Sequence, residues 1–373
     1  MPVYKDPNAQ NNKWYYSFSY KEGGKHKKKL KRGFKTKKEA EAAMVEAKDA
    51  MNKGSYVEPS KTSYGEFMIT WLEDKRTSVK ESTYLTYKNL VNNHILPSLG
   101  NIQLGKITPR DIQSLYNSIK IDEKLSSENL RKVHTVINDS LNKAAKWSMI
   151  LQNPAQLVDA PKVIKKEVEV WDQDDIKKFL KVAKGSRYFN AFLLALTTGM
   201  RQGEILGLRW KDVDEENQTL SIVQTLSHKG QQLSVGAKSV AGNRRISIDE
   251  NTLKELIKVK TTQKKEMIMN RPVYNEDNDL VIRTNTGAPL SPRNLLRSFY
   301  SCIEKAGVKN IRFHDLRHTH ASLLLKQGVN PKIVSERLGH ANVRITLDTY
   351  SHLLPNLQKE TANEFGKLFY GNN

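Results

Sequence analysis

The sequence predicts a multidomain α+β protein in three parts, and the spacing of apolar residues along the chain is the main reason. The N-terminal stretch alternates aromatic and polar residues around a glycine turn, the middle shows helical spacing only, and the remainder mixes both patterns. We therefore expect a small β-sheet-plus-helix module at residues 1–57, an all-α four-helix domain at 62–158, and a mixed, mainly helical domain with a small antiparallel sheet at 167–373.

The charge of the chain is strongly positive: Lys and Arg total 61 against 40 acidic residues, a formal net charge of +21. This balance favours a polyanionic partner, because neutralised phosphates release counterions; a basic surface that serves solubility alone is the alternative. Cys302 is the only cysteine, which excludes internal disulfides and cysteine zinc sites. Without an apolar signal core or a membrane-length apolar run, we expect a soluble cytoplasmic protein with no membrane partner.

The sequence of the N-terminal module predicts a hairpin followed by a helix. Residues 14–20 and 27–34 are extended runs on either side of a turn at 22–24, and Thr36 is expected to cap a helix, with Glu39 in the capping-box position. Between positions 21 and 38 there are ten basic residues against one acid. A solvated face explains this run as well as nucleic acid does, but the interleaved aromatics favour a small DNA-binding module that uses Lys27, Lys28 and Lys29.

The middle of the chain, after a linker at 57–60, predicts four helices. The first two cover 64–72 and 84–95, the third begins at Thr108-Pro109, and the fourth is capped by Ser126 or Ser127. Basic residues on the polar faces of these helices are candidate DNA contacts, although an ordinary surface position explains each of them equally. These candidates are Lys80, Lys88, His94, Arg131 and Lys143.

The last part follows a linker at 161–166. It opens with a buried helix over 192–198 that Gly199 stops, and a second helix begins near Arg201. Residues 219–226 alternate as a strand, residues 233–248 predict a hairpin that turns at 240–243, and helices follow to Tyr350 and beyond. The apolar tail after Leu354 suits a helix that packs either on its own domain or on a neighbouring subunit.

Several polar residues in this part suit chemistry at a DNA phosphate. His314 and Arg317 are three apart and share one face of a helix, Gly339 leaves His340 at a helix exit, and Tyr350 lies on a further short helix. Cutting DNA without a metal requires a nucleophile, cations over the phosphate, a proton acceptor and a proton donor. Arg201, at a helix start, supplies the second guanidinium that would complete a phosphate clamp.

Each of these residues taken alone also has an ordinary structural interpretation. A tyrosine at helical spacing is more often a core or surface residue than a nucleophile, and a single histidine is more often a hydrogen-bonded structural residue. The stretch from His314 to His318, with His320 nearby, also resembles the zinc-protease motif His-Glu-x-x-His. Asp315 stands in place of the glutamate, however, and zinc would explain neither the positive charge nor Arg201.

Taken together, the motifs resemble the tyrosine recombinase family, in particular the integrases of temperate phages and of integrative elements of Gram-positive bacteria. The resemblance covers the whole length and is specific because of the order and spacing of its parts. The matching pieces are Thr198-Gly199-Met200-Arg201-Gln202-Gly203-Glu204, His314-Asp315-Leu316-Arg317-His318, Leu338-Gly339-His340 and Asp348-Thr349-Tyr350-Ser351-His352.

The resemblance implies a role for each matching residue. Tyr350 would be the nucleophile that joins the 3′ phosphate, Arg201 and Arg317 would clamp that phosphate, and no cofactor would be needed. His340 would bind a non-bridging oxygen, and His314 would help to accept the tyrosine proton. The remaining roles fall to residues further upstream: Lys238 as general acid, Glu204 as support for Arg201 or as a plain exposed carboxylate, and Arg244 and Arg245 as backbone-phosphate contacts.

The function that the resemblance implies is site-specific recombination of double-stranded DNA by a homotetramer, through a Holliday junction. Residues 1–57 would bind arm-type sites and 62–158 core-type sites, and an excisionase and a host DNA-bending protein are expected partners in the bacterial nucleoid. A type IB topoisomerase, which relaxes supercoils, is the alternative enzyme. A non-catalytic DNA-binding regulator of the same fold is the alternative outside catalysis.

Overall fold

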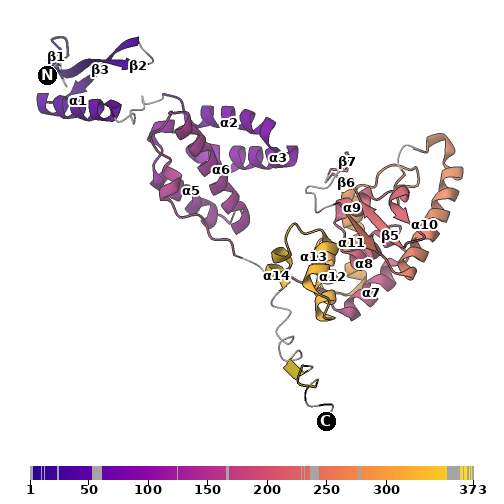
Figure 1. Ribbon diagram of the computed structural model, residues 1–373. Coiled ribbons are helices and arrows are strands. Elements are labelled where there is room, and N and C mark those ends of the chain that lie inside the picture. The colour runs from indigo at the N-terminus through magenta and orange to yellow at the C-terminus, as the bar shows by residue number, and fades with distance from the viewer. Residues whose placement is uncertain are drawn as a thin grey trace. The chain divides into compact units, whose positions relative to one another are not determined.

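The computed structural model describes residues 3–9, 11, 13–22, 25–52, 61–123, 125–164, 168–227, 229–230, 232–235, 243–275 and 279–350, with scattered positions between 362 and 371. The chain forms two compact units, Met1–Lys166 and Glu167–Asn373 (Figure 1). The predicted fold class is confirmed, because helices dominate and the sheets are small and antiparallel. The apolar tail after Leu354 lies largely outside the described residues.

A three-stranded antiparallel sheet and one helix form the N-terminal module. The elements, with the strands in the sheet order β1-β2-β3, are β1 (Val3–Lys5), β2 (Trp14–Glu22), β3 (Lys25–Phe34) and α1 (Lys37–Asn52). Tyr16 and Phe18 of β2 share a buried cluster with Met44 of α1. The cap is confirmed, since Glu39 N–H donates to Thr36 Oγ1 at 3.2 Å and Thr36 N–H donates to the Glu39 carboxylate at 3.3 Å. The sequence does not predict β1, because three residues are too few for an alternating pattern.

Helices alone build the next part of the chain. The elements are α2 (Tyr64–Ser78), α3 (Glu81–Leu90), η1 (Val91–Ile95), α4 (Leu96–Leu99), η2 (Leu104–Lys106), α5 (Pro109–Ile121), α6 (Ser127–Lys146) and η3 (Pro154–Leu157). Their buried faces meet in one core that includes Trp71 and Ile137. Thr108 caps α5 as predicted, and Ser126 rather than Ser127 caps α6 by accepting a hydrogen bond from the Asn129 N–H at 3.3 Å.

The second predicted helix runs further than the expected 84–95. It begins at Glu81 and continues through the π-helical turn η1 into α4, although Pro97 lies inside it. In a regular helix the proline ring clashes with the carbonyl four residues earlier, and a wider turn relieves that clash. The π turn directly precedes Pro97, so it allows the helix to continue to Leu99.

The second unit places helices around two small sheets. Its helical elements are α7 (Gln173–Ala183), α8 (Phe189–Thr198), α9 (Gln202–Gly207), η4 (Trp210–Asp212), α10 (Glu250–Met269), η6 (Arg271–Val273), α11 (Pro292–Ala306), α12 (Asp315–Lys326), α13 (Pro331–Leu338) and α14 (Val343–Tyr350). Its strands are β4 (Val213–Asp214), β5 (Thr219–Ile222), β6 (Gln224–Leu226), β7 (Leu233–Val235) and β8 (Arg244–Ser247). The sheets have the orders β4-β5-β8 and β6-β7.

Two strand predictions were wrong. Residues 219–226 form two strands, β5 and β6, which enter different sheets. β8 pairs with β5 (Ile246 opposite Leu220) and β7 pairs with β6 (Leu233 opposite Leu226), so β7 and β8 are not the two arms of one hairpin. An alternating pattern shows which face of a strand is buried but does not select its partner. Of the turn predicted at 240–243, only Asn243 is described.

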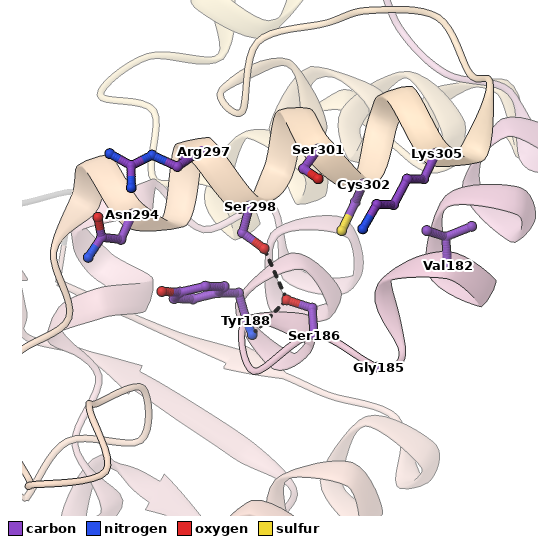
Figure 2. Close-up of a pocket in the computed structure, with 10 residues that line it drawn as sticks. All are labelled: Val182, Gly185, Ser186, Tyr188, Asn294, Arg297, Ser298, Ser301, Cys302 and Lys305. Carbon is purple, nitrogen blue, oxygen red and sulfur yellow. Dashed lines mark hydrogen bonds between the residues drawn. The ribbon is translucent and has the colours of Figure 1, made fainter.

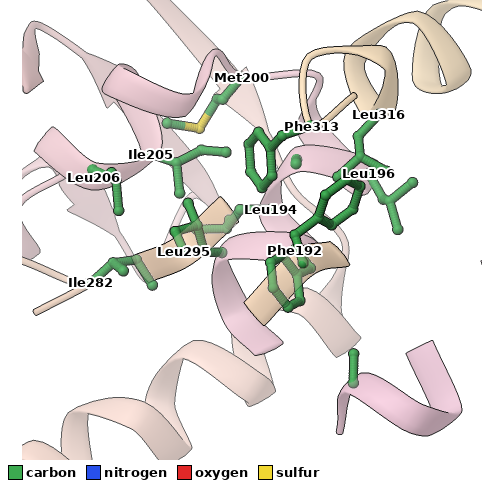
Figure 3. Close-up of a cluster of buried hydrophobic side chains, with 14 of the residues drawn as sticks. Phe192, Leu194, Leu196, Met200, Ile205, Leu206, Ile282, Leu295, Phe313 and Leu316 are labelled. Atoms are coloured by element: carbon green, nitrogen blue, oxygen red, sulfur yellow. The ribbon is translucent and has the colours of Figure 1, made fainter. Parts of the chain in front are cut away.

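One hydrophobic core holds the segments that carry Arg201 and Arg317 (Figure 3). Phe192 and Leu194 of α8 are fully buried in it, and Met200 and Ile205 are buried in it on either side of Arg201 in the sequence. Leu316, in the first turn of α12, joins the same core. The positions of Arg201 and Arg317 therefore follow from the packing of their apolar neighbours.

Candidate active site

The turn between α8 and α9 presents Arg201. Gly199 ends α8 in the left-handed conformation (φ 66°), which favours glycine, and a Cβ at that position would lie 2.6 Å from Leu338 Cδ2. Arg201 donates from Nη1 to Glu204 Oε1 at 2.8 Å, while its side chain is 42% exposed. The guanidinium is thus oriented by the protein and still accessible to a ligand.

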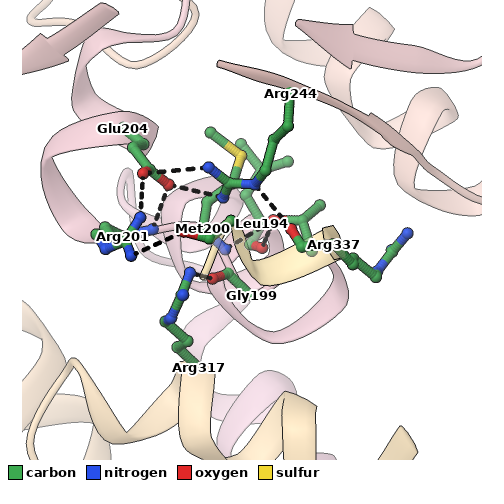
Figure 4. A network of polar contacts seen from close by, with 10 residues as sticks. Leu194, Gly199, Met200, Arg201, Glu204, Arg244, Arg317 and Arg337 are labelled. Carbon is green, nitrogen blue, oxygen red and sulfur yellow. Dashed lines mark hydrogen bonds and ion pairs between the residues drawn. The ribbon is translucent and has the colours of Figure 1, made fainter. Parts of the chain in front are cut away.

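Arg317 lies beside this turn and is buried, with 3% exposure (Figure 4). Its Nη1 donates to the Gly199 carbonyl at 2.8 Å, and its Nη2 has no hydrogen-bond partner among the described residues. Burial, followed by the charge of Arg201, lowers the pKa of Arg317 to about 9, so it stays charged at neutral pH. A buried cation with an unused donor suits an oxyanion that is not part of the protein.

Glu204 and Arg244 form an ion pair next to Arg201. The Glu204 carboxylate accepts from the Arg201 N–H at 2.9 Å and pairs with Arg244 Nη2 at 2.9 Å (Figure 4). Burial alone raises the pKa of Glu204, but the hydrogen bond and charge of Arg244, together with Arg201, bring it below its usual value. The alternative prediction for Glu204 was a plain exposed carboxylate. At 6% exposure the residue is buried, which contradicts that alternative.

Arg244 was predicted as a contact to the DNA backbone, and its burial in the structure does not favour that role. Its side chain is 7% exposed, and its Nε donates to the Arg337 carbonyl at 2.8 Å in addition to the ion pair with Glu204. A guanidinium enclosed in this way braces β8 against α9 and α13 rather than reaching for a DNA backbone. Arg245, whose partner across the sheet is Ser221, is exposed as expected.

Tyr350 contacts a histidine that the sequence had not suggested for this role. The Tyr350 hydroxyl lies 2.6 Å from His318 Nδ1, and the ring is 1% exposed in a cluster with Leu325, Val334 and Leu338. Burial, followed by the neighbouring His314, lowers the pKa of His318 to about 4, and burial raises that of Tyr350. The four-residue spacing of His314 and His318 was the sequence feature that could have indicated His318, but it suggested only a metal-binding motif.

His314 and His340 both interact with His318. The His314 ring lies edge-on to His318, with 5.1 Å between centroids, and its side chain is exposed. His340 follows Gly339, which ends α13 in the left-handed conformation, and its Nδ1 lies 2.8 Å from Thr346 Oγ1. Burial, followed by Arg317 and Arg201, lowers the pKa of His340 to about 4, so this imidazole is neutral at pH 7.

Lys238 lies outside the described residues, as does most of the segment between β7 and β8. The structure therefore hydrogen-bonds Arg201 to Glu204 and places Arg317 next to them on the Gly199 carbonyl. It places Tyr350 with His318 and His314 in a second group. Electrostatic coupling between Arg317 and Tyr350 links the two groups. Arg317 precedes His318 on α12, and its charge acts on both His318 and Tyr350.

The basic residues of the N-terminal module are divided between two faces. Lys27 and Lys29 stand opposite Tyr20 and Phe18 across β2 and β3, so they lie on the face that packs against α1. Lys28 lies on the opposite face. That face also carries Tyr15, which stacks with Tyr4 at 5.4 Å and lies 5.5 Å from the Arg32 guanidinium.

In the helical part of the chain, Lys80 at the N-cap of α3 and Lys88 on α3 are exposed, and His94 lies within the π turn η1. Arg131 is exposed but donates from Nη1 to the Pro161 carbonyl at 3.3 Å. Lys143 lies 3.2 Å from the Asp74 carboxylate and over the Trp147 ring. Its acidic partner makes Lys143 the weakest of these candidate DNA contacts.

A cavity in the second unit lies apart from these residues. It measures about 720 Å³ and is lined by residues of α11 and of the α7–α8 connection, among them Ser186, Arg297 and Lys305 (Figure 2). None of the candidate catalytic residues lines it.

Among the described residues, no group of three or more His, Cys, Asp or Glu side chains is placed to hold a metal ion. His318 contacts Tyr350, whereas His320 lies 2.8 Å from the Leu196 carbonyl and accepts from Arg337 Nε at 3.1 Å. The two rings thus have different partners, which does not favour the zinc-protease interpretation. In the part of the chain that the structure describes, no helix is long and apolar enough to cross a membrane.

Comparison with known proteins identifies the family. Residues 169–356 match the phage integrase family, 63–120 its N-terminal SAM-like domain, and 2–51 an arm DNA-binding domain. A tyrosine recombinase XerC-like protein of Caldanaerobacter subterraneus is 31% identical over 97% of this chain and 98% of its own length. The ICEBs1 integrase of Bacillus subtilis is 28% identical over 82% of this chain and 83% of its own length.

Solved structures agree in fold. The Tn1549 transposon integrase in complex with transposon right end DNA has a TM-score of 0.69 at 21% identity, covering 82% of this chain and all of that one. A lambda integrase dimer bound to a core site has a TM-score of 0.58 at 19% identity, covering 77% of this chain and 95% of that one. The chain belongs to the phage integrase family of tyrosine recombinases. It is a site-specific DNA recombinase.

Proposed function

We propose that the chain is an integrase that inserts and excises a phage or mobile element by cutting and rejoining DNA through Tyr350. The observation that carries this proposal is the neighbourhood of Tyr350: its hydroxyl contacts His318, and the preceding residue, Arg317, is a buried cation with an unused donor. A nucleophile beside an anion-binding cation is what attack on a DNA phosphate requires.

In this mechanism the Tyr350 oxygen attacks the scissile phosphorus, a 3′-phosphotyrosine forms, and the 5′ oxygen leaves with a proton supplied by Lys238. Arg201 and Arg317 neutralise the non-bridging oxygens. His340 can donate to one of them from Nε2 when Thr346 donates to its Nδ1. Because the ester conserves the energy of the broken bond, the 5′ hydroxyl of another strand can reverse the step without ATP.

The division of the chain supports recombination between two kinds of site. The match of residues 2–51 to an arm DNA-binding domain supports contact with arm-type sites, and residues 62–158 would hold core-type sites. The full reaction would use a tetramer on DNA, a Holliday junction, an excisionase and a host DNA-bending protein, in the bacterial cytoplasm. Relaxation of supercoils needs no second class of binding site, which disfavours a topoisomerase.

The test is a covalent adduct on DNA. The full chain is incubated with duplexes carrying the two junctions of the element that encodes it, and adducts are resolved by denaturing electrophoresis with mapping of the cleaved phosphate. We expect an adduct on the 3′ phosphate that disappears in Tyr350→Phe, and joined product when both partner duplexes are present. An adduct that persists in Tyr350→Phe would contradict the assignment of Tyr350 as the nucleophile.

Two other outcomes point to the alternatives. Multiple-turnover relaxation of a supercoiled plasmid, without joining of the two duplexes, indicates a topoisomerase. DNA binding with no adduct on any junction duplex indicates a non-catalytic regulator. A matched control is Tyr300→Phe, because Tyr300 is an exposed tyrosine of α11 outside the site, and this variant is expected to form the adduct at the unchanged rate.

A further inference from the structure

The contact between Tyr350 and His318 concerns the deprotonation of the tyrosine, a step that the arginines do not perform. A phenol must lose its proton to attack, and burial raises the pKa of Tyr350, so an acceptor has to be built in. At 1% exposure the Tyr350 side chain has almost no access to bulk water that could take the proton. Among the described residues, its hydroxyl has one hydrogen-bond partner, His318 Nδ1 at 2.6 Å.

We propose that His318 accepts the Tyr350 proton during strand cleavage, and that His314 acts behind His318 as the exposed end of a proton path. The inference rests on the proposed function, in which Tyr350 is the nucleophile. It moves the contact with the tyrosine proton from His314, where the resemblance placed it, to the residue four positions later on the same face of α12.

The step balances without a further reactant. The O–H bond of Tyr350 breaks, its electron pair forms the new O–P bond, and the proton moves to His318 Nδ1, while Nε2 keeps the proton it already carries. The P–O5′ bond breaks, and the leaving oxygen takes a proton from the general acid. When a 5′ hydroxyl attacks the phosphotyrosine, the imidazolium returns its proton to the phenolic oxygen.

The surroundings of His318 explain why it would act only when DNA is bound. The titratable and charged groups that face it are His314, Asp315, Arg317 and Arg312 at the start of α12, His340 after α13, and Tyr350 on α14. Burial and the neighbouring positive charges keep the imidazole neutral in the free protein, with a lone pair available. The monoanionic phosphodiester of DNA beside Arg317 would offset those charges and stabilise the imidazolium.

His314 is the positioning residue in this arrangement. Its ring stands edge-on to His318 at 5.1 Å and 88°, and its side chain is exposed whereas Tyr350 is enclosed. The two histidines therefore join the enclosed hydroxyl to the protein surface. If His314 acts only through His318, removing both residues has no greater effect than removing His318 alone.

The competing interpretation is that His318 merely holds Tyr350 in an enclosed position. The phenolic oxygen has to be uncovered towards the phosphate before attack, and a contact that only restrained it would slow that step. Restraint and proton acceptance predict opposite effects of removing the imidazole. His318→Asn separates them, because the asparagine amide can hold the hydroxyl near the position of Nδ1 but cannot take its proton.

The experiment measures single-turnover cleavage by the full chain on a junction duplex whose scissile link is a 5′-bridging phosphorothiolate. This leaving group needs no proton, so the assay reports the nucleophile and not Lys238. We expect His318→Asn to cleave roughly 100-fold more slowly with unchanged DNA affinity, and its pH–rate profile to lose the rise that deprotonation of His318 gives the unchanged chain. Replacing Tyr350 by a fluorotyrosine of lower pKa should recover most of the rate in His318→Asn.

His320→Asn is the matched control, because His320 is buried on the same helix and faces Leu196 rather than Tyr350. It is expected to unfold at a lower temperature but to keep the rate and the pH profile. The double variant His314→Asn/His318→Asn should be no slower than His318→Asn; additive slowing would overturn the role of His314.

Cleavage by His318→Asn at the unchanged rate or faster overturns the inference, as does slow cleavage that fluorination does not rescue. If His318→Asn does not fold, the unchanged chain decides: a rate about twofold slower in D₂O is expected, and no isotope effect contradicts the proposal. Failure of the proposed function is distinguishable, because the unchanged chain would then form no adduct, or Tyr350→Phe would still form it.

Discussion

Arg317 Nη1 donates to the Gly199 carbonyl oxygen at 2.8 Å, and this bond joins two arginine-bearing segments that are 118 residues apart in the sequence. The same glycine ends α8 with a φ of 66°, which directs the chain towards Arg201. Both guanidiniums of the proposed phosphate clamp therefore depend on the backbone at one residue.

Gly199→Ala is expected to destabilise the second unit and to reduce cleavage. The left-handed φ costs a side chain about 1–3 kcal/mol, and the new Cβ would lie 2.6 Å from Leu338 Cδ2 and 2.8 Å from His320 Cδ2, so the total should be roughly 2–4 kcal/mol. Thermal unfolding of the full chain measures this. Gly307→Ala separates strain from clash, since Gly307 has a φ of 61° with no atom within 4 Å. Equal losses in the two variants would contradict the steric argument.

Arg244→Ala should cost about 3–5 kcal/mol of unfolding free energy, because it leaves the Glu204 carboxylate buried with Arg201 as its remaining cation. Glu204→Gln/Arg244→Met removes both charges of the pair and should cost less than the sum of the single changes. Arg245→Ala, at the exposed neighbouring position, is expected to stay within about 0.5 kcal/mol. Additivity in the double variant would show that the pair is not coupled.

Thr346→Val tests how His340 is oriented. Thr346 is fully buried and its hydroxyl lies 2.8 Å from His340 Nδ1, so the change removes that bond at nearly constant volume. We expect single-turnover cleavage to slow roughly tenfold, which corresponds to about 1.4 kcal/mol, with DNA affinity unchanged. Thr349→Val is the control, because the Thr349 hydroxyl donates to the Ile345 carbonyl on the same helix. An equal effect in both variants would assign the loss to α14 and not to His340.

Stability should fall as the pH drops from about 6.5 to about 4. Burial and then Arg337 lower the pKa of His320 to about 4, so in this window the unfolded chain binds a proton that the folded chain does not. Each pKa unit corresponds to about 1.4 kcal/mol, so His320 alone should account for roughly 3 kcal/mol below pH 4. His318 and His340 act in the same direction.

Unfolding temperatures measured across this pH range test the prediction. His320→Gln should flatten part of the decline, whereas His26→Gln, at an exposed position of β3, should leave it unchanged. A constant unfolding temperature of the second unit between pH 7 and pH 4.5 would contradict the assigned pKa shifts.

The sequence correctly predicted helix caps and helix ends, because these features depend only on residues close by in the chain. Thr36, Thr108 and Ser126 cap helices because their side chains reach the third residue of each helix, and Gly199 and Gly339 end helices in the left-handed conformation. The sequence did not predict which strands pair. Residues 219–226 were predicted as one strand, yet they form β5 and β6, which belong to two sheets. Pairing depends on distant segments, which local alternation does not encode.

The sequence by itself determined the fold class, the family resemblance and the residues proposed to contact the phosphate, and it predicts a division into three parts. These features depend on residue identity, spacing along one helix and turn chemistry, all of which act within a few residues. Only the tertiary structure decided that Arg244 is buried against Glu204 and that the Tyr350 hydroxyl contacts His318 rather than His314. Those contacts join side chains 40 and 32 residues apart, and long-range packing of the core sets which of them meet.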